Sequence, residues 1–273
     1  MKRILLLLVL VAAVSCSPKT YTIIQVADAQ LGFDAAVKTG TPGPGYVNDL
    51  TYEIECLKAT VAKINEIKPD AVVFTGDQVH LPTDVEQWDA FMEIIAGIDP
   101  SIVQYHLPGN HDHVLSGGTA DPTDFIHRFG SDRFVVKEEG LNLIGLNTSL
   151  IYFNSDMEQE QLEWLESILE STDKDDVTLV FGHHPYFCEN IDEEDTHVQI
   201  PKSKRYEYFN LFVEKGVDAV FAGHLHESAA GEYKGIPMLT TTSSGYQLGD
   251  ESPSVRLITV TGNKVKEEFI IVK

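Results

Sequence analysis

The feature that most constrains this chain is a repeated unit, a short apolar strand that ends in a polar, glycine-containing turn. Runs of β-branched and aliphatic residues predict strands over 20–26, 71–74, 102–106, 141–146, 177–181 and 217–221. Apolar residues at helical spacing predict helices between several of them, over 50–64, 84–95, 158–169 and 202–213. This alternation is typical of an α/β protein.

The pattern changes after residue 225 to β alternation without intervening helices, over 237–242, 255–261 and 267–272. The sequence shows no internal repeat and no long linker. One α/β domain over residues 20–273 is therefore the economical interpretation.

The first sixteen residues are typical of an export signal. Lys2 and Arg3 precede an apolar run over 4–14, which is followed by Ser15 and Cys16. A cysteine in this position resembles the lipobox of bacterial lipoproteins, so we expect residues 1–15 to be removed and Cys16 to carry lipid. The prediction is an exported protein of the cell envelope, held at the membrane by this anchor only. Plain secretion is the alternative.

Charge and cysteine content narrow the possible partners and cross-links. The chain has 42 acidic and 20 basic side chains, a formal net charge of −22. Affinity for nucleic acids comes mainly from cationic side chains that displace counterions, so no DNA or RNA partner is expected. Apart from Cys16, the cysteines are Cys56 and Cys188, and the sequence leaves open whether they are free or paired.

Five of the predicted strands are followed by segments rich in polar donors. These are Asp28-Ala29-Gln30, Gly76-Asp77, Gly109-Asn110-His111-Asp112, Gly182-His183-His184-Pro185 and Gly223-His224-Leu225-His226. Loops at the carboxyl ends of strands converge on one crevice of an α/β sheet, so these segments can be neighbours. Carboxylate, amide and imidazole donors without thiolate favour a divalent ion such as Mn, Fe or Zn.

The segments differ in how strongly each one indicates a metal site. Asp-x-Gln and Gly-Asp alone are usually turns or helix caps. Gly-Asn-His-Asp and Gly-His-x-His are rare, and the joint occurrence of all five in this order makes coincidence negligible.

In this order the segments resemble the signature of the calcineurin-like metallophosphoesterase superfamily, and the resemblance covers almost the whole chain after the signal. It implies a four-layer αββα sandwich, in which two mixed β-sheets are flanked by helices, and a centre of two divalent metal ions. His111 would lie beside the substrate. The implied ligands are Asp28, Gln30, Asp77 and His226 for the first metal, and Asp77, Asn110, His183 and His224 for the second, with Asp77 as the bridge.

Gln30 stands where most members of the superfamily have His. This departure resembles one subgroup, the calcineurin-like phosphoesterase-domain protein phosphatases, in which Gln is usual. An amide oxygen is a harder and weaker ligand than imidazole, so we expect the first site to favour Mn or Mg. No Tyr follows Gly76-Asp77, where purple acid phosphatases carry one, which disfavours that branch.

The constellation predicts a metal-dependent phosphoester hydrolase. Two ions can hold a bridging hydroxide for in-line attack on phosphorus. His111 would stabilise the phosphoryl group and protonate the leaving alkoxide, with Asp112 as its orienting partner. We expect a phosphomonoesterase that acts on a small phosphorylated molecule or a phosphoprotein. A phosphodiesterase for a cyclic nucleotide or phospholipid headgroup and a catalytically silent binding scaffold are the alternatives, and the oligomeric state is left open.

The residues around this site are less well defined. Segment 186–200 should overhang it, either as a specificity loop or as a solvated surface loop. Lys202, Lys204 and Arg205 oppose the dipole of the predicted helix that follows, which indicates a contact with phosphate or an acidic ligand. Candidate rim residues, chosen by proximity to the motifs, are His80, His113, Asn147, Tyr186 and Tyr246.

Overall fold

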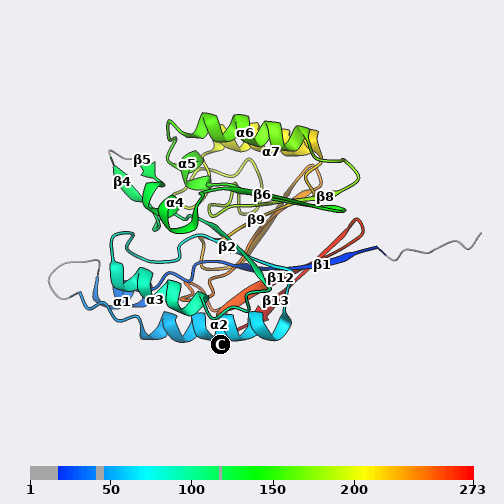
Figure 1. Cartoon of the computed structure of the whole chain (residues 1–273). Coiled ribbons are helices and arrows are strands. Elements are labelled where there is room, and N and C mark those ends of the chain that lie inside the picture. Colours follow the sequence, from blue (N-terminus) through cyan, green and yellow to red (C-terminus); the bar gives the residue numbers. More distant parts are fainter. Residues whose placement is uncertain (1–17, 41–45, 117–118) are drawn as a thin grey trace, which may run out of the picture.

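Two mixed β-sheets lie face to face in the computed structural model, and helices cover the outer face of each sheet (Figure 1). The structure describes residues 18–40, 46–116 and 119–273, so the predicted signal peptide and Cys16 lie outside the described residues. Within those ranges no helix has the length and apolar character needed to span a bilayer. The arrangement is the predicted four-layer αββα sandwich.

The first sheet contains the N-terminal strands together with the C-terminal hairpin. Its order is β13 (Lys264–Ile271), β12 (Ser254–Thr261), β1 (Thr20–Val26), β2 (Ala71–Thr75) and β3 (Val103–Leu107). β1, β2 and β3 are parallel, whereas β12 is antiparallel to both of its neighbours. Helices α1 (Phe33–Thr39), α2 (Thr51–Ile67) and α3 (Val85–Ile95) lie on its outer side (Figure 1).

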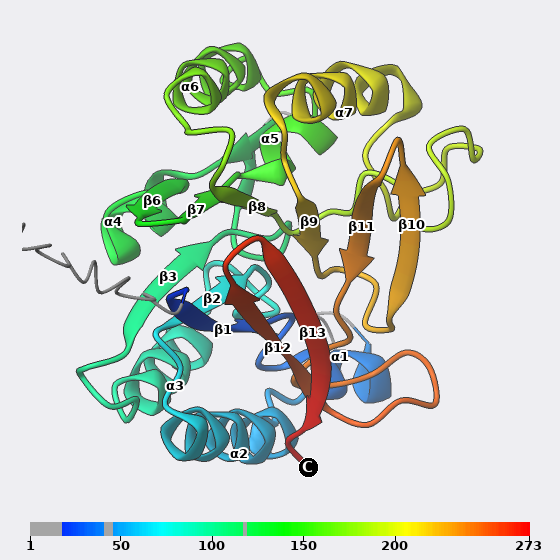
Figure 2. The ribbon, with the colours of Figure 1, turned by 90° about the vertical axis from the view of Figure 1, so that its right-hand side faces the viewer.

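The second sheet has a parallel centre and antiparallel edges. Its order is β10 (Ala229–Tyr233), β11 (Ile236–Thr240), β9 (Ala219–Ala222), β8 (Val177–Phe181), β7 (Leu141–Gly145) and β6 (Phe134–Glu138). Helices α6 (Glu158–Glu170) and α7 (Lys202–Lys215), with the short α5 (Thr148–Tyr152), cover its outer side, opposite α2 and α3 (Figure 2). Between β3 and β6 lie β4 (Val114–Ser116), β5 (Thr119–Asp121) and α4 (Thr123–Phe129).

Three apolar layers explain why the central strands are continuous apolar runs. Phe74 and Phe91 belong to the layer between the first sheet and its helices. Ile23 and Leu179 belong to the layer between the two sheets. A third layer, which includes Phe209, joins the second sheet to α6 and α7. Strands covered on both faces need apolar residues at every position, not an alternating pattern.

The longer elements lie within a few residues of their predicted ranges, whereas seven short ones were not predicted. These are α1, α4, α5, β4, β5, β6 and β10. They are three to seven residues long, too short for a clear apolar period. The elements that carry the five motif segments are all among those predicted from the sequence.

Candidate metal centre

Backbone hydrogen bonds hold the motif segments together beyond the ends of the strands. The Asp28 amide donates to the Gly76 carbonyl at 3.2 Å, and the Gln30 amide donates to the Asp77 carbonyl at 2.8 Å. In the second sheet, the Gly223 amide donates to the His183 carbonyl at 2.9 Å. The loops therefore continue the strand pairing, and this brings residues from both sheets to one place.

Backbone conformations that are unusual for side-chain-bearing residues are concentrated in these loops. Among the described non-glycine residues, positive φ angles occur at Asp28 (51°), Gln30 (34°), Asp77 (50°), His224 (74°) and His226 (56°), and at three positions elsewhere. Such conformations cost free energy and persist only where the surroundings enforce them. Their concentration at one site is typical of functional centres.

One group of potential metal-ligand atoms surrounds the ring of His183. Its Nε2 lies 3.2 Å from Asp77 Oδ2, 3.1 Å from Asn110 Oδ1 and 3.1 Å from His224 Nδ1. The other ring nitrogen donates to the Thr75 carbonyl at 2.9 Å, which orients the imidazole. The other three predicted ligands of the second metal thus each contact the ring of His183.

The predicted ligands of the first metal lie next to the same cluster. His226 Nε2 is 3.6 Å from Asp28 Oδ1, and the Nδ1 of His226 donates to the Tyr246 carbonyl. The His224 amide donates to Asp28 Oδ2 at 2.9 Å. Asp28 and Gln30 are fully buried, yet Asp28 Oδ1 and Gln30 Oε1 have no hydrogen-bond partner in the structure. Buried acceptors without a donor fit a bound cation.

The buried carboxylates of Asp28 and Asp77 need positive charge nearby to remain ionised. Burial raises the pKa of Asp28. Burial also acts to raise the pKa of Asp77, but the attraction of His183 and then His111 outweighs it and lowers that pKa. Burial acts to lower the pKa of His183, but the same pairing with Asp77 raises it to about 9. In the structure without metal, a proton on His183 thus provides positive charge beside these carboxylates, and a bound divalent ion would provide it instead.

The protonation state of His224 also suits a bound metal ion. Burial, followed by the neighbouring His183, lowers the pKa of His224 to about 3, so this ring is neutral at physiological pH. Neutral imidazole is the form that binds metal ions. The residues present therefore fit a centre of divalent ions with oxygen and nitrogen ligands.

His111 lies beside Asp77 as expected, but its ring has a different partner from the predicted one. Its amide donates to Asp77 Oδ1 at 2.8 Å, and its Nδ1 donates to the His80 carbonyl at 2.9 Å. Asp112 instead uses both carboxylate oxygens on backbone amides, at 2.9 Å from Gln78 N and 2.8 Å from Gly109 N. The orienting contact expected from Asp112 is therefore made by His80, because the Asp112 carboxylate holds the turns that carry Asp77 and Asn110.

The cluster forms the floor of a cleft of about 480 Å³. Of the motif residues, the cleft is lined by Gln30, Asp77, Asn110, His111, His184, His224, Leu225 and His226. His197 and Val198 also line it, so segment 186–200 does overhang the site. Tyr152 holds this segment, since its hydroxyl donates to the His197 carbonyl at 2.9 Å. The sequence did not single out Tyr152 or His197, because neither belongs to a motif.

The cations after segment 186–200 have partners within the chain, which differs from the predicted phosphate contact. Arg205 is fully buried and donates to the Ile200 carbonyl at 2.8 Å and to Asp195 Oδ1 at 2.9 Å. Lys202 donates to the Asp192 carbonyl at 2.7 Å, and Lys204 pairs with Glu158. Lys202 and Arg205 thus fasten segment 186–200, the acidic loop, to α7, and Lys204 joins α7 to α6.

Of the candidate rim residues, two hold rings of the site in place and the other three are buried. The carbonyls of His80 and Tyr246 orient the rings of His111 and His226, respectively. His113 and Asn147 are buried and lie 3.3 Å apart, between His113 Nε2 and Asn147 Oδ1. Tyr186 is buried in the apolar layer beneath α7, so it is a packing residue. Cys56 and Cys188 are free.

The fold and the site define a metallophosphoesterase. The family description "Calcineurin-like phosphoesterase" matches residues 21–228, and the chain belongs to that family. The chain is 33% identical over 259 residues to the serine/threonine-protein phosphatase CPPED1 of Danio rerio, covering 90% of this chain and 83% of that protein. The identity to the human protein of the same name is 30% over 256 residues, covering 89% and 81%.

Other relatives carry different names. A "Probable cyclic nucleotide phosphodiesterase" of Rhodococcus erythropolis is 28% identical over 193 residues, covering 66% of this chain and 58% of that protein. Among solved structures, a dimetal phosphatase from Danio rerio superposes with a TM-score of 0.64 at 15% identity, covering 93% and 99% of the two chains. A purple acid phosphatase from yellow lupin superposes with a TM-score of 0.68 at 14% identity, covering 93% and 52%. These structures share the fold.

Proposed function

We propose that this protein is a phosphomonoesterase that uses two divalent metal ions. The observation that carries the proposal is the pair of buried oxygens without a hydrogen-bond partner, Asp28 Oδ1 and Gln30 Oε1, close to the group of side chains around His183. Two adjacent groups of donors at the floor of one cleft suit two ions. The similarity to proteins named serine/threonine phosphatases supports a phosphomonoester as substrate.

Each side chain has a role in this proposal. The first ion would be held by Asp28, Gln30, Asp77 and His226, and the second by Asp77, Asn110, His183 and His224. Two ions bound there would supply an activated water and would neutralise charge on the phosphoryl group. Asp77 suits the shared position because its two oxygens face different neighbours, His111 N and His183 Nε2.

His111 is proposed as the group that contacts the substrate. It is half-buried in the wall of the cleft, and its amide is fixed on Asp77. Because the His80 carbonyl can only accept, Nδ1 of His111 carries a proton. A second proton, on Nε2, would give the ring a donor that faces the cleft, which would stabilise the phosphoryl group and be available to a leaving alkoxide.

The alternative of a phosphodiesterase is favoured by one finding, the similarity to proteins named as phosphodiesterases. Both reactions place a phosphoryl group on the same donors, so comparison of substrates must decide between them. We expect hydrolysis of p-nitrophenyl phosphate to exceed that of bis-p-nitrophenyl phosphate, to stop after chelation and to return with Mn²⁺. A preference for the diester would favour the alternative. No metal-dependent hydrolysis of either compound would refute the enzyme proposal.

A matched pair of variants tests the assignment of the site. Asp77→Asn keeps the size of the side chain but removes its charge, and we expect it to abolish metal-dependent turnover. Asp192→Asn makes the same change on the exposed acidic loop and should leave turnover unchanged. Equal activity of Asp77→Asn and the parent protein would refute the site.

A further inference from the structure

We propose that His184 supplies a third imidazole to the second metal position, beside His183 and His224. We further infer that this nitrogen-rich position takes a borderline transition ion such as Zn²⁺, whereas the first position takes Mn²⁺ or Mg²⁺. The inference rests on the proposed function, and it assigns a residue to the centre that the motif alone does not.

The first observation is that His184 is buried beside the centre without a polar partner. The residue is 1% exposed and lines the cleft. Neither ring nitrogen has a hydrogen-bond partner in the structure. A neutral imidazole carries one N–H donor and one lone pair, and a buried polar group without a partner is costly. A ligand at the floor of the cleft would provide the missing partner.

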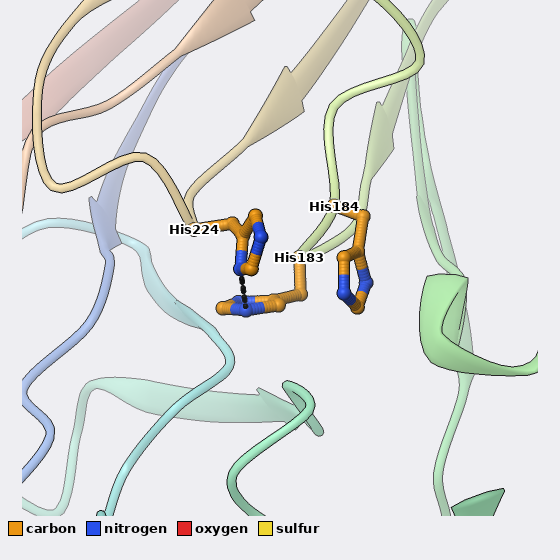
Figure 3. A group of neighbouring side chains, drawn as sticks. All are labelled: His183, His184 and His224. Carbon is orange, nitrogen blue, oxygen red and sulfur yellow. Dashed lines mark hydrogen bonds between the residues drawn. The ribbon is translucent and has the colours of Figure 1, made fainter. Parts of the chain in front are cut away.

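The second observation is the distance between the three rings. His183, His184 and His224 each offer one nitrogen, and these nitrogens all lie within 4.8 Å of one another. Figure 3 shows the rings of His183 and His184 arising from consecutive residues after β8, with the ring of His224 beside them. The ring centroids of His184 and His224 are 4.5 Å apart. One ion bonded to all three nitrogens at about 2.0–2.1 Å would draw them to within about 4.2 Å of one another, so the rings would move closer together on binding.

The third observation is that the protein holds this ring in place. Thr148 Oγ1 accepts hydrogen bonds from the amides of His183 and His184, at 2.9 and 2.8 Å. The ring of Tyr152 stacks on that of His184, with centroids 4.3 Å apart and planes 9° from parallel. The imidazole is therefore held in position beside the centre.

The two positions would then differ in their donors. The first would combine three oxygens, from Asp28, Gln30 and Asp77, with a single imidazole. The second would have three imidazoles in addition to oxygens from Asp77 and Asn110. Oxygen donors suit Mn²⁺ and Mg²⁺, and imidazole suits Zn²⁺ and related ions. This difference in donor type is the physical basis for two different ions in one centre.

The test compares His184→Phe with His197→Gln. Phenylalanine keeps the stacking on Tyr152 and removes both nitrogens, whereas His197 is a histidine of the cleft outside the three-ring group. Metal-free proteins are dialysed against equal concentrations of Zn²⁺ and Mn²⁺, and bound metals are counted by mass spectrometry. Zn²⁺ affinity is measured against a competing chelator, and the visible spectrum of the Co²⁺ form reports its ligands.

We expect the parent protein and His197→Gln to retain both Zn²⁺ and Mn²⁺. His184→Phe should bind Zn²⁺ at least about 10-fold more weakly, with a changed Co²⁺ spectrum and unchanged Mn²⁺ content. Parental Zn²⁺ affinity and Co²⁺ spectrum in folded His184→Phe would overturn the inference. If that variant does not fold, His184→Gln is measured in the same way, with the same outcomes. A parent protein that binds no metal would instead refute the proposed function.

Discussion

Gly109 is the residue at which a single methyl group should disturb the metal centre most directly. A Cβ atom at this position would lie 2.1 Å from Asp77 Oδ1, 2.5 Å from Asp77 N and 2.7 Å from Asp77 Cγ. Gly109 is not among the described glycines with positive φ, so alanine is disfavoured by these contacts and not by backbone conformation. Rotation of the Asp77 carboxylate cannot relieve the contact with the backbone nitrogen. The Gly109→Ala substitution must therefore shift one of the two loops.

The size of the effect follows from these contacts. Extra volume at a closely packed position costs about 1–3 kcal/mol of unfolding free energy. Displacing a group that supports a metal ligand costs about 10–100-fold in metal affinity or activity. We therefore expect Gly109→Ala to bind Mn²⁺ and to hydrolyse p-nitrophenyl phosphate about 10–100-fold more weakly, with a loss of about 1–3 kcal/mol in stability.

Gly249→Ala provides the control. Its new Cβ would meet the Glu227 Oε2 atom at 3.3 Å, the mobile end of an exposed side chain. Mn²⁺ titration, steady-state hydrolysis and urea unfolding with chelator are measured for both variants. We expect parental values for Gly249→Ala. Parental metal affinity in Gly109→Ala would show that Asp77 does not need its present position, and would refute the reasoning.

Three further predictions concern other parts of the chain. Burial lowers the pKa of His106 to about 3 beside the stacked ring of Phe74, so the unfolded chain takes up a proton below pH 6.5 that the native protein excludes. The unfolding free energy should fall by up to about 1.4 kcal/mol per pH unit between pH 6.5 and 3 through this group. Urea unfolding at pH 7 and 5 should therefore show a smaller fall for His106→Phe than for the parent protein, and equal falls would contradict the prediction. Arg205→Met should cost about 1.5–3 kcal/mol, because it leaves the Ile200 carbonyl without its charged donor, and should speed proteolysis within 186–200; unchanged cleavage would exclude Arg205 as the fastener of that loop. Cys16→Ala should move the protein from the membrane fraction to the soluble fraction, and persistence in the membrane fraction would rule out a lipid anchor at Cys16.

The convergence of the main donors could be predicted from topology, whereas their assignment as metal ligands came from the family resemblance. Asp28, Asp77, His183 and His224 each follow a strand directly, and parallel strands place their carboxyl ends at the same edge. No contact between distant side chains had to be known. The periodicity of the chain predicted an α/β domain, whereas the two mixed sheets were implied only by the resemblance to the metallophosphoesterase superfamily.

Other residues could not be assigned in this way. Asp112 is next to His111 in the chain, yet its carboxylate contacts the amides of Gln78 and Gly109. Arg205 lies in the first turn of α7, yet its side chain is buried and contacts Asp195 of segment 186–200. Proximity in sequence suggested the partner of Asp112, and the helix dipole suggested a phosphate contact for Arg205. In both cases the hydrogen-bonding needs of buried polar groups in the folded chain decided otherwise.

What the sequence determined by itself is the class of fold and the chemical identity of the donors, because periodicity and motif order are local properties of a chain. Only the tertiary structure decided which contacts orient the donors, where His184 lies and which residues close the cleft. Tyr152 and His197 come from segments outside the motifs and meet only after the second sheet has formed. Contacts of this kind depend on the packing of several elements at once, so no single stretch of sequence encodes them.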